Sequence, residues 1–477
     1  MFSYSLSEIA RVTNGSVSGG DPETMVSGFF VDSRECIAGG VFVAIPGERV
    51  DGHAFLSDVQ QSGATLALIN KSFTGSIPAG LAVLAVENTV TALGQIAHWT
   101  RATKLHAKVI GITGSSGKTT TKDFIAGILE KCAPTEYAKG SFNTEVGLPL
   151  TILGAHPDTQ FLVLEMGMRG VGHIETLAHI AVPDVGVVTN VGSAHVGLLG
   201  SVENIAQAKG ELIRSLGPHG IAVLNADDPR VLNMASNTVA SVVTYGEHHD
   251  AVFRAVNVEV DSDGRASYTL HHAGDSYPVH LMIPGEHQVF NSLAAIAACA
   301  SVGIEVSLAA ELIGHVERIS KWRMEVTHLE NGVTVINDSY NANPESMRAA
   351  LKTLANMARG KRSIAVLGPM KELGDFSMQE HDSLGRLAVR LDISRLLCVG
   401  DDMKVTHLGA AQEGSWGDES HWVPDVDAAI DYLRENIAPG DVVLVKASRS
   451  VGLDRVAHAL ISGEISKVSD GQPKGVS

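Results

Sequence analysis

The chain has 477 residues, which at ordinary domain size predicts about three domains rather than a single core. Hydrophobic residues make up 44% of it and charged residues 19%, a balance typical of globular proteins. The formal net charge of −17 argues against a nucleic-acid partner, because phosphate backbones are bound by basic surfaces. Any site for phosphate groups must therefore be built locally, from backbone amides and a few cations.

The four cysteines, at positions 36, 132, 299 and 398, are widely spaced and form no CxxC pair. The sequence thus indicates neither a zinc site nor a disulfide framework, and free thiols fit a reducing cytosol. Residues 1–15 lack a basic stretch followed by an apolar one, which argues against a signal peptide. The longest apolar run, residues 293–302, is too short to cross a membrane and predicts a buried helix. We expect a cytoplasmic protein without an inserted segment, with a monomer as the default.

Hydrophobic patterning divides the chain into three α/β regions. The first, residues 1–86, has short β-rich segments such as 41–45 and a turn at 51–53. The second, residues 87–316, begins with a helical pattern at 90–101 and then alternates strands with helices, which is typical of a parallel sheet. Its strands are predicted at 107–113, 161–165, 185–190 and 221–225, followed by an antiparallel insertion at 241–283.

The third region, residues 317–477, repeats this alternation on a smaller scale. Its polar last stretch, from about residue 463, lacks periodicity and predicts a disordered tail. The expected fold class is α/β in three domains: a small first domain, a central domain with a phosphate-binding loop on a parallel sheet, and a Rossmann-like third domain. The strands of the third domain are predicted at 333–338, 363–368, 395–400 and 441–446.

A phosphate-binding loop is the strongest motif in the chain. Residues 108–122 read KVIGITGSSGKTTTK, so an apolar strand ends in glycines and a lysine and threonines open a helix. Glycines let backbone N–H groups turn toward phosphate oxygens, and the helix N-terminus adds a positive dipole end. The strict pattern has glycine where Ile112 stands, so this loop is a variant; Lys118 is predicted to reach the β- and γ-phosphates of ATP. The predicted nucleotide-binding residues are Gly114, Ser115, Ser116, Gly117, Lys118, Thr119 and Thr120, with the Thr119 hydroxyl on Mg²⁺.

Two further candidates follow predicted strands. Ligands of open parallel sheets bind at the carboxyl ends of the strands, where the phosphate loop also lies. Glu165 ends one strand, and a carboxylate there suits Mg²⁺, which prefers oxygen ligands. His195 follows another strand in the segment TNVGSAHVG, and alone it fits a structural histidine as well as a ligand. Lys209, taken alone, is typical of a surface lysine at the start of a helix.

These motifs resemble those of the Mur ligase family, three-domain enzymes that build the peptide stem of peptidoglycan. The resemblance implies amide formation driven by ATP through an acyl phosphate, and it extends from about residue 28 to about residue 450. The segments that carry it are GITGSSGKTTTK at 111–122, NTEVGLP at 143–149, EMG at 165–167, TNVGSAHVGLLGS at 189–201, and Lys209.

Two segments are similar to the branch of the family that adds D-alanyl-D-alanine to UDP-N-acetylmuramoyl-tripeptide. They are DSYNANP at 338–344 and LGPMKELGD at 367–375, the latter followed by His381. The third region carries no DNPR-type motif, which the diaminopimelate-adding relatives have there. The resemblance implies three substrates, namely ATP, the UDP-linked tripeptide and the dipeptide, with Mg²⁺ as cofactor and CO₂ for a lysine modification.

The resemblance also implies roles for single residues. Lys209 is implied to be carbamylated by CO₂, which turns a cation into an anion with oxygen ligands for Mg²⁺. Thr119 and Glu165 would then hold one ion, and His195 and Lys209 a second. Arg323 matches an arginine used on ATP phosphates, although many relatives have glycine where Trp322 precedes it. The other implied ATP contacts are His287, Asn291 and Asp338, and the implied substrate contacts are Ser33, Arg34, Phe42, Asn143, Thr144, Asn341, Asn343 and Ser448.

The distribution of these residues predicts a site between domains. The implied ATP contacts fall on the second and third regions, whereas the contacts to the UDP end fall on the first. We expect the domains to close over the acyl phosphate and exclude water, with Arg323 entering the site only when the third domain moves in.

Three other interpretations stay open at this stage. Another ATP-dependent amide ligase of the same fold, such as a sister Mur enzyme or folylpolyglutamate synthase, would share the phosphate loop. A P-loop kinase or ATPase of another class would need no amine acceptor. A scaffold without activity would be expected to lack Lys118, Glu165 or Lys209, and all three are present. No motif decides whether the third residue of the peptide stem is diaminopimelate or lysine, and no single residue must be the general base.

Overall fold

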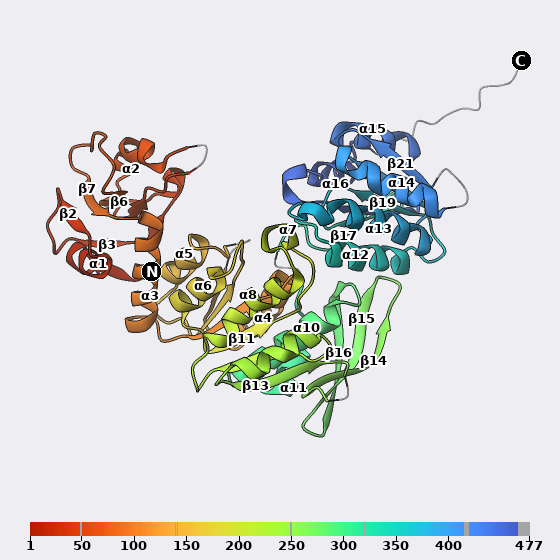
Figure 1. Ribbon diagram of the computed structural model, residues 1–477, viewed down its shortest axis with the longest axis horizontal. Coiled ribbons are helices and arrows are strands. Elements are labelled where there is room, and N and C mark those ends of the chain that lie inside the picture. Colours follow the sequence, from red (N-terminus) through yellow and green to blue (C-terminus); the bar gives the residue numbers. More distant parts are fainter. Residues whose placement is uncertain are drawn as a thin grey trace, which may run out of the picture.

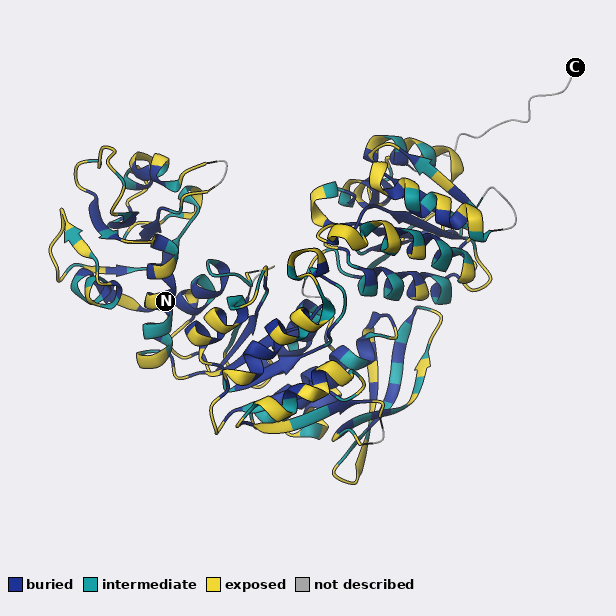
Figure 2. Cartoon of the chain, in the orientation of Figure 1, coloured by how far each residue is buried: buried dark blue, intermediate teal, exposed yellow. Residues whose placement is uncertain are grey.

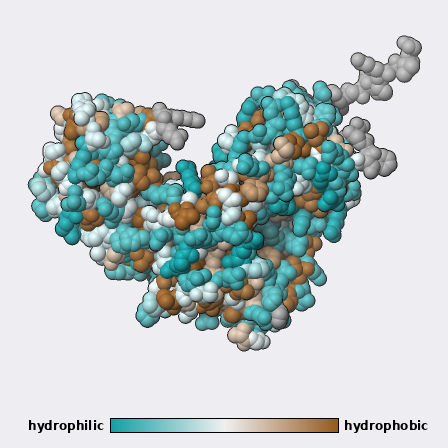
Figure 3. Space-filling view, viewed as in Figure 1, coloured by the Kyte–Doolittle hydropathy of each residue, from teal (hydrophilic) through white to brown (hydrophobic). Residues whose placement is uncertain are grey.

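The computed structural model describes residues 1–47, 50–138, 140, 142–248, 250–317, 320–414 and 419–465. Figure 1 shows three α/β bodies arranged as an open V, with the central body at its base and the first and third domains on its two arms. Strands are buried inside each body, whereas the helices turn exposed faces outward (Figure 2). The visible surface is largely hydrophilic with scattered apolar side chains (Figure 3). The expected α/β fold in three domains is confirmed.

The first domain is built on a small sheet of order β2-β7-β6-β5-β4, in which only β2 runs antiparallel to its neighbour. Its first helix, α1 (Leu6–Thr13), begins at a capping box in which Ser5 and Glu8 each accept a hydrogen bond from the backbone of the other. The remaining elements are β1 (Ser3–Ser5), β2 (Ser16–Ser18), β3 (Met25–Ser27), β4 (Phe29–Phe30), β5 (Val41–Val43), α2 (Leu56–Gln61), β6 (Leu66–Asn70) and β7 (Ala82–Val86).

Helix α3 (Thr89–Thr103) joins the first domain to the central one. The hydroxyl groups of Tyr4 and Thr100 lie 3.0 Å apart in a buried hydrogen bond across this junction. The ammonium of Lys104 lies 4.7 Å from the centre of the Tyr4 ring and donates to the Ser3 carbonyl at 2.8 Å. Aromatic packing and a cation over a ring thus fix the first domain on this helix.

The central domain contains a nine-stranded sheet of order β16-β15-β14-β13-β12-β11-β8-β10-β9. Apolar strands buried on both faces are typical of parallel sheets, and here helices cover both sides. Its strands are β8 (Lys108–Thr113), β9 (Thr135–Tyr137), β10 (Phe161–Glu165), β11 (Val185–Val188), β12 (Ile221–Asn225), β13 (Ser241–Gly246), β14 (Phe253–Val260), β15 (Arg265–His272) and β16 (Asp275–Pro284). Its helices are α4 (Lys118–Leu129), α5 (Gly147–Gly154), α6 (His173–Ala181), α7 (Val196–Leu199), α8 (Val202–Arg214), α9 (Pro229–Leu232), α10 (Gln288–Ser301) and α11 (Val306–Ile313).

Three expectations about this domain need correction. The strand expected at 185–190 ends at Val188, because Thr189 turns out of the sheet and donates to the Ser116 carbonyl at 2.6 Å. The stretch 241–283 is not a separate antiparallel insertion: β13 pairs in parallel with β12 and with β14, so the central sheet continues into the antiparallel strands β14–β16. Lys209 lies in the second half of α8 rather than at its start, and it is buried.

The third domain has a six-stranded sheet of order β17-β18-β22-β19-β20-β21, parallel except for β17. Ile465, just after the last helix, is buried, and the rest of the expected disordered tail lies outside the described residues. The elements are β17 (Glu325–His328), β18 (Thr334–Asn337), α12 (Pro344–Met357), β19 (Ser363–Leu367), α13 (Ser377–Arg390), β20 (Arg395–Val399), α14 (Lys404–Glu413), β21 (Ser420–Val423), α15 (Val426–Asn436), β22 (Val442–Lys446) and α16 (Asp454–Ile461).

The apolar helices and the cysteines bear on two expectations from the sequence. Within the described ranges, no helix is both long and apolar enough to cross a membrane. The run at 293–302 lies almost wholly in α10, whose residues are largely buried, as expected. All four cysteines are free thiols.

The packing of α13 on α14 depends on Gly385. A Cβ added there would lie 2.0 Å from the carbonyl oxygen of Thr406, a backbone atom that cannot move aside alone. We expect Gly385→Ala to destabilise the chain by about 1–3 kcal/mol, because the two helices must separate. Urea unfolding of the full chain measures the change. The matched control is Gly154→Ala at the end of α5, where an added Cβ meets nothing within 4 Å; equal losses in both variants would contradict the packing argument.

Candidate active site

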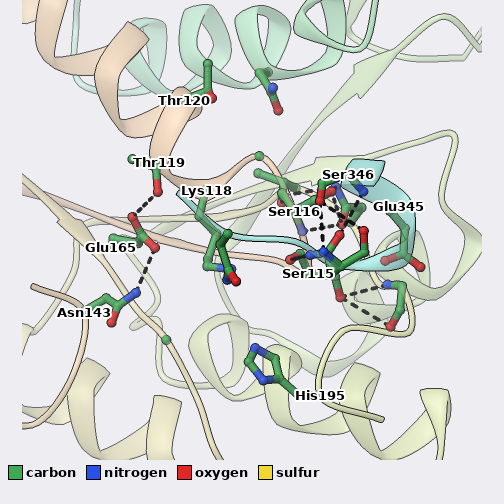
Figure 4. A pocket seen from close by; sticks show the side chains of 18 of the residues that line it. Ser115, Ser116, Lys118, Thr119, Thr120, Asn143, Glu165, His195, Glu345 and Ser346 are labelled. Carbon is green, nitrogen blue, oxygen red and sulfur yellow. Dashed lines mark hydrogen bonds between the residues drawn. The ribbon is translucent and has the colours of Figure 1, made fainter. Parts of the chain in front are cut away.

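A cavity of about 930 Å³ lies between the central and third domains. The central domain lines it with the phosphate loop and with the ends of β10, β11 and β12. The third domain lines it with residues 323 and 324, with residues of the segment 338–349, and with Glu372 and Lys446. Figure 4 shows the phosphate loop facing Glu345 and Ser346 of the third domain, with His195 below. The volume is at the upper end of ordinary small-molecule sites, which suits a nucleotide with part of a second substrate.

The phosphate loop connects β8 to α4 through backbone that only glycine adopts easily. Gly114 has φ +152°, and a Cβ there would lie 1.8 Å from the Thr189 hydroxyl oxygen. Gly117 has φ +80°, and its added Cβ would lie 2.3 Å from Oδ1 of Asn291. These close approaches leave the N-terminus of α4 open to the cavity, where backbone N–H groups and the helix dipole favour an anion.

Lys118 is the first residue of α4 and lines the cavity. Its ammonium donates to the Gly114 carbonyl at 2.7 Å, so it is held over the loop. Burial lowers the pKa of Lys118, the negative charge of Glu165 opposes that shift, and the positive charge of Arg323 adds to it. An anion entering the loop would pair with this cation and offset its burial.

Thr119 and Glu165 meet at the edge of the sheet. The Thr119 hydroxyl donates to Oε2 of Glu165 at 2.8 Å, and the Asn143 amide donates to Oε1 at 2.9 Å. Glu165 is only 2% exposed, which is unusual for a carboxylate. A hydroxyl beside a buried carboxylate is a donor set that fits Mg²⁺ next to phosphates. In the described ranges, however, no three His, Cys, Asp or Glu side chains gather as a metal group, so substrate oxygens or water would have to complete the shell.

His195 and Lys209 occupy different positions relative to the cavity. His195 lines it, and its Nδ1 lies 2.6 Å from Oε2 of Glu372 in the third domain. The contact with His195 lowers the pKa of Glu372 and burial raises it. The contact is the larger effect, so the pKa is lowered. Lys209 does not line the cavity; it is buried in α8, and burial together with the charge of Lys118 lowers its pKa well below its usual value. Lys209 therefore interacts electrostatically with Lys118 of the phosphate loop, although it lies outside the cavity lining.

The third domain contributes a buried ion pair and a stacked arginine. Lys446 lies 2.6 Å from the Asp338 carboxylate and also donates to the Asn341 carbonyl at 2.8 Å. The Arg323 guanidinium lies 4.3 Å from the centre of the Tyr340 ring, and its Nε is buried without a hydrogen-bond partner. An arginine with an unsatisfied N–H at a polar cavity is poised to bind an anion.

Asn343 connects the two domains at the phosphate loop. Its side chain caps α12, with Pro344 at the first helical position, and its Nδ2 donates to the Ser115 carbonyl at 3.1 Å. On the opposite wall, burial lowers the pKa of His287 to about 4, so this ring is neutral at physiological pH. Neighbouring Asn291 donates to Gln288 at 2.7 Å.

The structure brings most of the implied site residues to this cavity but leaves several outside it. Arg34 is 86% exposed on the first domain and pairs with Asp32 at 2.5 Å, next to Ser33. Phe42 is fully buried in the core of the first domain, so its side chain supports the sheet and offers no surface to a substrate, contrary to expectation. Ser448 is buried and accepts a hydrogen bond from the Lys371 backbone at 3.0 Å. The expected residues that line the cavity are Ser115, Ser116, Gly117, Lys118, Thr119, Thr120, Asn143, Thr144, Glu165, His195, His287, Asn291, Arg323, Asp338, Asn341 and Asn343.

Several charged residues of the cavity were missed from the sequence. Glu145 and His173 form an ion pair 3.2 Å long on its wall. Glu345 and Glu372 belong to the DSYNANPES and LGPMKELGD segments, so their position inside distinctive motifs was an available signal. Arg169 stands a few residues after Glu165, and nothing in its local sequence separates it from a surface arginine.

Comparisons with known families and proteins agree over almost the whole chain. The family model described as "Mur ligase middle domain" matches residues 112–299, "Mur ligase, glutamate ligase domain" matches 322–449, and "Mur ligase family, catalytic domain" matches 26–100. A UDP-N-acetylmuramoyl-tripeptide--D-alanyl-D-alanine ligase of Mycobacterium tuberculosis (strain ATCC 25618 / H37Rv) is 41% identical, over 97% of this chain and 99% of that protein. The ligase of the same name from Bacillus subtilis (strain 168) is 33% identical, over 98% and 100%.

Solved structures give the same answer. A crystal structure of MurF from Acinetobacter baumannii superposes with a TM-score of 0.87 at 29% identity, covering 97% of this chain and 99% of that one. The MurF ligase of Thermotoga maritima in complex with ADP superposes with a TM-score of 0.80 at 28% identity, covering 93% and 99%. Since family models match all three domains and the identity to relatives holds along nearly the full length, this chain belongs to the Mur ligase family.

Proposed function

We propose that this protein is an ATP-dependent ligase that joins D-alanyl-D-alanine to UDP-N-acetylmuramoyl-tripeptide, with release of ADP and phosphate. The observation that carries the proposal is one cavity in which the phosphate loop and the Thr119–Glu165 pair face the DSYNANP segment of the third domain. Relatives that bear this ligase name cover nearly the whole chain at 33% and 41% identity.

The reaction must activate a carboxylate, because oxide is too poor a leaving group for direct attack by an amine. Transfer of the γ-phosphoryl group breaks the bond between phosphorus and the β–γ bridging oxygen, and a carboxylate oxygen of the tripeptide forms the new bond while ADP leaves. The amine of the dipeptide then attacks the acyl carbon, loses one proton, and the tetrahedral intermediate expels phosphate. An α-amine has a pKa near ~8, so enough of it is neutral without a dedicated base.

The residues of the cavity stabilise the charge that moves in these steps. Lys118 on the central domain and Arg323 on the third both line the cavity, and the charge of Arg323 lowers the pKa of Lys118, so both can act on one polyphosphate there. Thr119 and Glu165 would hold Mg²⁺ beside it, and the ion supplies charge neutralisation on the phosphates. Docking of the third domain over the loop limits the access of water.

The UDP end of the donor is proposed to bind the first domain at Ser33 and Arg34. The Arg34 guanidinium is exposed, and among the described residues only Asp32 pairs with it, so a diphosphate could take over the fork of N–H donors. In the other direction, the peptide must reach the cavity beside the phosphate loop. The donor would then span the space between the first and third domains, which Figure 1 shows on the two arms of the V.

Carbamylation of Lys209 is part of the proposal and has a physical basis in its burial. The side chain is 1% exposed, and within the described residues no hydrogen bond or ion pair to its ammonium is present. Since burial lowers its pKa well below the usual value, the neutral amine is favoured, and that is the form that attacks CO₂. The attack forms a carbamate and releases one proton, and the resulting anion would offset the charge of Lys118.

The function is tested by phosphate release from MgATP in the presence of UDP-N-acetylmuramoyl-tripeptide. We expect release only when D-alanyl-D-alanine is also present, with the UDP-linked pentapeptide as product. Single D-alanine, diaminopimelate and glutamate serve as parallel acceptors. Release supported by diaminopimelate or lysine would move the protein to a sister activity of the family, and release without any acceptor would contradict the ligase proposal.

Lys118→Ala should abolish most of the activity. We expect kcat to fall about 10³-fold or more, because the γ-phosphoryl group loses its nearest cation during transfer. Lys131→Ala is the matched control, since Lys131 is exposed just beyond the other end of α4. Thermal unfolding of both variants checks that the fold is kept. A Lys118→Ala enzyme with more than a tenth of the normal kcat would contradict the assigned role.

Lys209→Arg should prevent carbamylation while keeping a cation of similar length. With ¹³C-labelled bicarbonate, we expect a carbamate carbon resonance in the protein that has Lys209 and none in the Lys209→Arg variant. Removal of dissolved CO₂ should lower the activity of the enzyme that has Lys209, and added bicarbonate should restore it. If this enzyme gives no carbamate signal at full activity, Lys209 acts as a free amine and the carbamylation proposal fails.

A further inference from the structure

The loop that bears His195 is held by two different domains. Its first half is anchored to the central domain: the Val191 N–H donates to Asp228 at 2.7 Å and the Gly192 N–H donates to Ser115 Oγ at 2.8 Å. Its second half, residues 193–197, has hydrogen bonds within the loop and otherwise turns toward the third domain. Val196 packs into the apolar core, but within the part of the chain that the structure describes, the hydrogen bonds of residues 193–197 that leave the loop go to the third domain.

Glu345 binds the loop at Ser193. Its Oε1 accepts from the Ser193 N–H at 2.8 Å and from the Ser193 hydroxyl at 3.0 Å. A Cβ on Gly192 would lie 2.4 Å from the Glu345 carboxyl carbon, so the approach requires glycine there. The other oxygen, Oε2, is buried without a hydrogen-bond partner, a cost that a residue selected for stability alone would avoid.

Glu372 contacts the loop at His195 and Gly197, two and four residues after Ser193. Its carboxylate lies 2.6 Å from His195 Nδ1, and its carbonyl accepts from the Gly197 N–H at 3.2 Å. A Cβ on Gly197 would lie 2.4 Å from the Gly374 nitrogen, so the two backbones touch. Glu372 itself has φ +65°, a conformation that costs a non-glycine residue free energy and that aims its side chain at the loop.

We propose that Glu345 and Glu372 are positioning residues that hold residues 193–197 so that His195 faces the phosphate cavity only while the third domain is docked. The Glu372 carboxylate lies against Nδ1 of His195, so this contact orients the ring and leaves Nε2 to face the Mg²⁺–phosphate site, in the way that outer carboxylates orient histidine ligands of metals. The inference rests on the proposed function for the task of His195. It couples completion of the ion site to domain docking, so that phosphoryl transfer awaits an assembled site.

Amide hydrogen exchange of the full chain without substrates tests the docking contact. We expect Glu345→Gln, Glu372→Gln and Gly197→Ala each to speed exchange of residues 193–199 about tenfold, because each weakens a charge-assisted bond or pushes the domains apart. Matched controls are Glu435→Gln, which removes an exposed charge of the third domain, and Gly217→Ala, where an added Cβ meets nothing within 4 Å. The proposal would be overturned if residues 193–199 exchanged at the same rate in all three variants as in the parent protein.

The dependence of the rate on Mg²⁺ tests the positioning of His195. In Glu372→Gln we expect the Mg²⁺ concentration for half-maximal rate to rise about tenfold, with kcat recovered at high Mg²⁺ and the midpoint of thermal unfolding unchanged. A purely structural role would lower kcat at every Mg²⁺ concentration and would overturn the inference. Because exchange is measured without substrates, a faster loop in a chain that lacks ligase activity would support the docking contact and refute only the proposed function.

Discussion

The close contact between the phosphate loop and the loop after β11 is the constraint on which the site depends. These loops follow neighbouring parallel strands, β8 and β11, and they interlock: the Ser115 N–H donates to the Asn190 carbonyl at 3.0 Å, and the Thr189 hydroxyl donates to the Ser116 carbonyl at 2.6 Å. No side chain fits between them at Gly114. The Ser115 carbonyl is then the point at which Asn343 attaches the third domain. Sheet register, loop shape and domain docking are thus one connected system.

The buried side of helix α4 also links the phosphate loop to the third domain. Lys122 and Asp123 form an ion pair 2.7 Å long, and both side chains are nearly fully buried. Asp123 also accepts from the backbone and hydroxyl of Ser320, at 3.0 Å and 3.1 Å, where the chain passes into the third domain. A buried ion pair adds little stability by itself, but it fixes geometry when its remaining atoms are satisfied. The helix that opens at the phosphate loop therefore also holds the connection that leads into the third domain.

The sequence predicted those parts of the fold that depend on local pattern. Strands buried on both faces read as continuous apolar runs, so β10 and β12 were predicted to the residue. Strand pairing was harder, because a run such as β13 looks the same whether its neighbour is parallel or antiparallel. The phosphate loop was predictable because chemistry dictates its spacing. The distinctive segments around Glu345 and Glu372 were a signal for these residues, but their contacts with the loop after β11 were not predictable, since the partners are more than 150 residues away in the chain.

Both Lys209 and Phe42 are buried, although the sequence suggested a surface position for the lysine and a substrate contact for the phenylalanine. Lys209 looks like a surface lysine because Gln207 and Glu211 stand two residues to either side of it, yet it is buried in α8. Phe42 sits in a motif tied to substrate, yet β5 alternates and puts its ring in the domain core. Sequence motifs mark the segment that builds a site, whereas the direction of each side chain follows from the element's period and its neighbours.

The segment around Arg323 shows how a strained backbone conformation is accommodated. The φ of Trp322, +59°, is one that glycine adopts at no cost, whereas another residue loses about 1–2 kcal/mol. The guanidinium of Arg449 lies 4.0 Å from the centre of the Trp322 ring, and such a contact returns about 0.5–2 kcal/mol. The Trp322 carbonyl also accepts from the Tyr340 N–H at 3.1 Å, beneath the ring on which Arg323 stacks. The tryptophan thus keeps the glycine-like backbone that aims Arg323 at the cavity, and it adds a side-chain contact to the segment after β22.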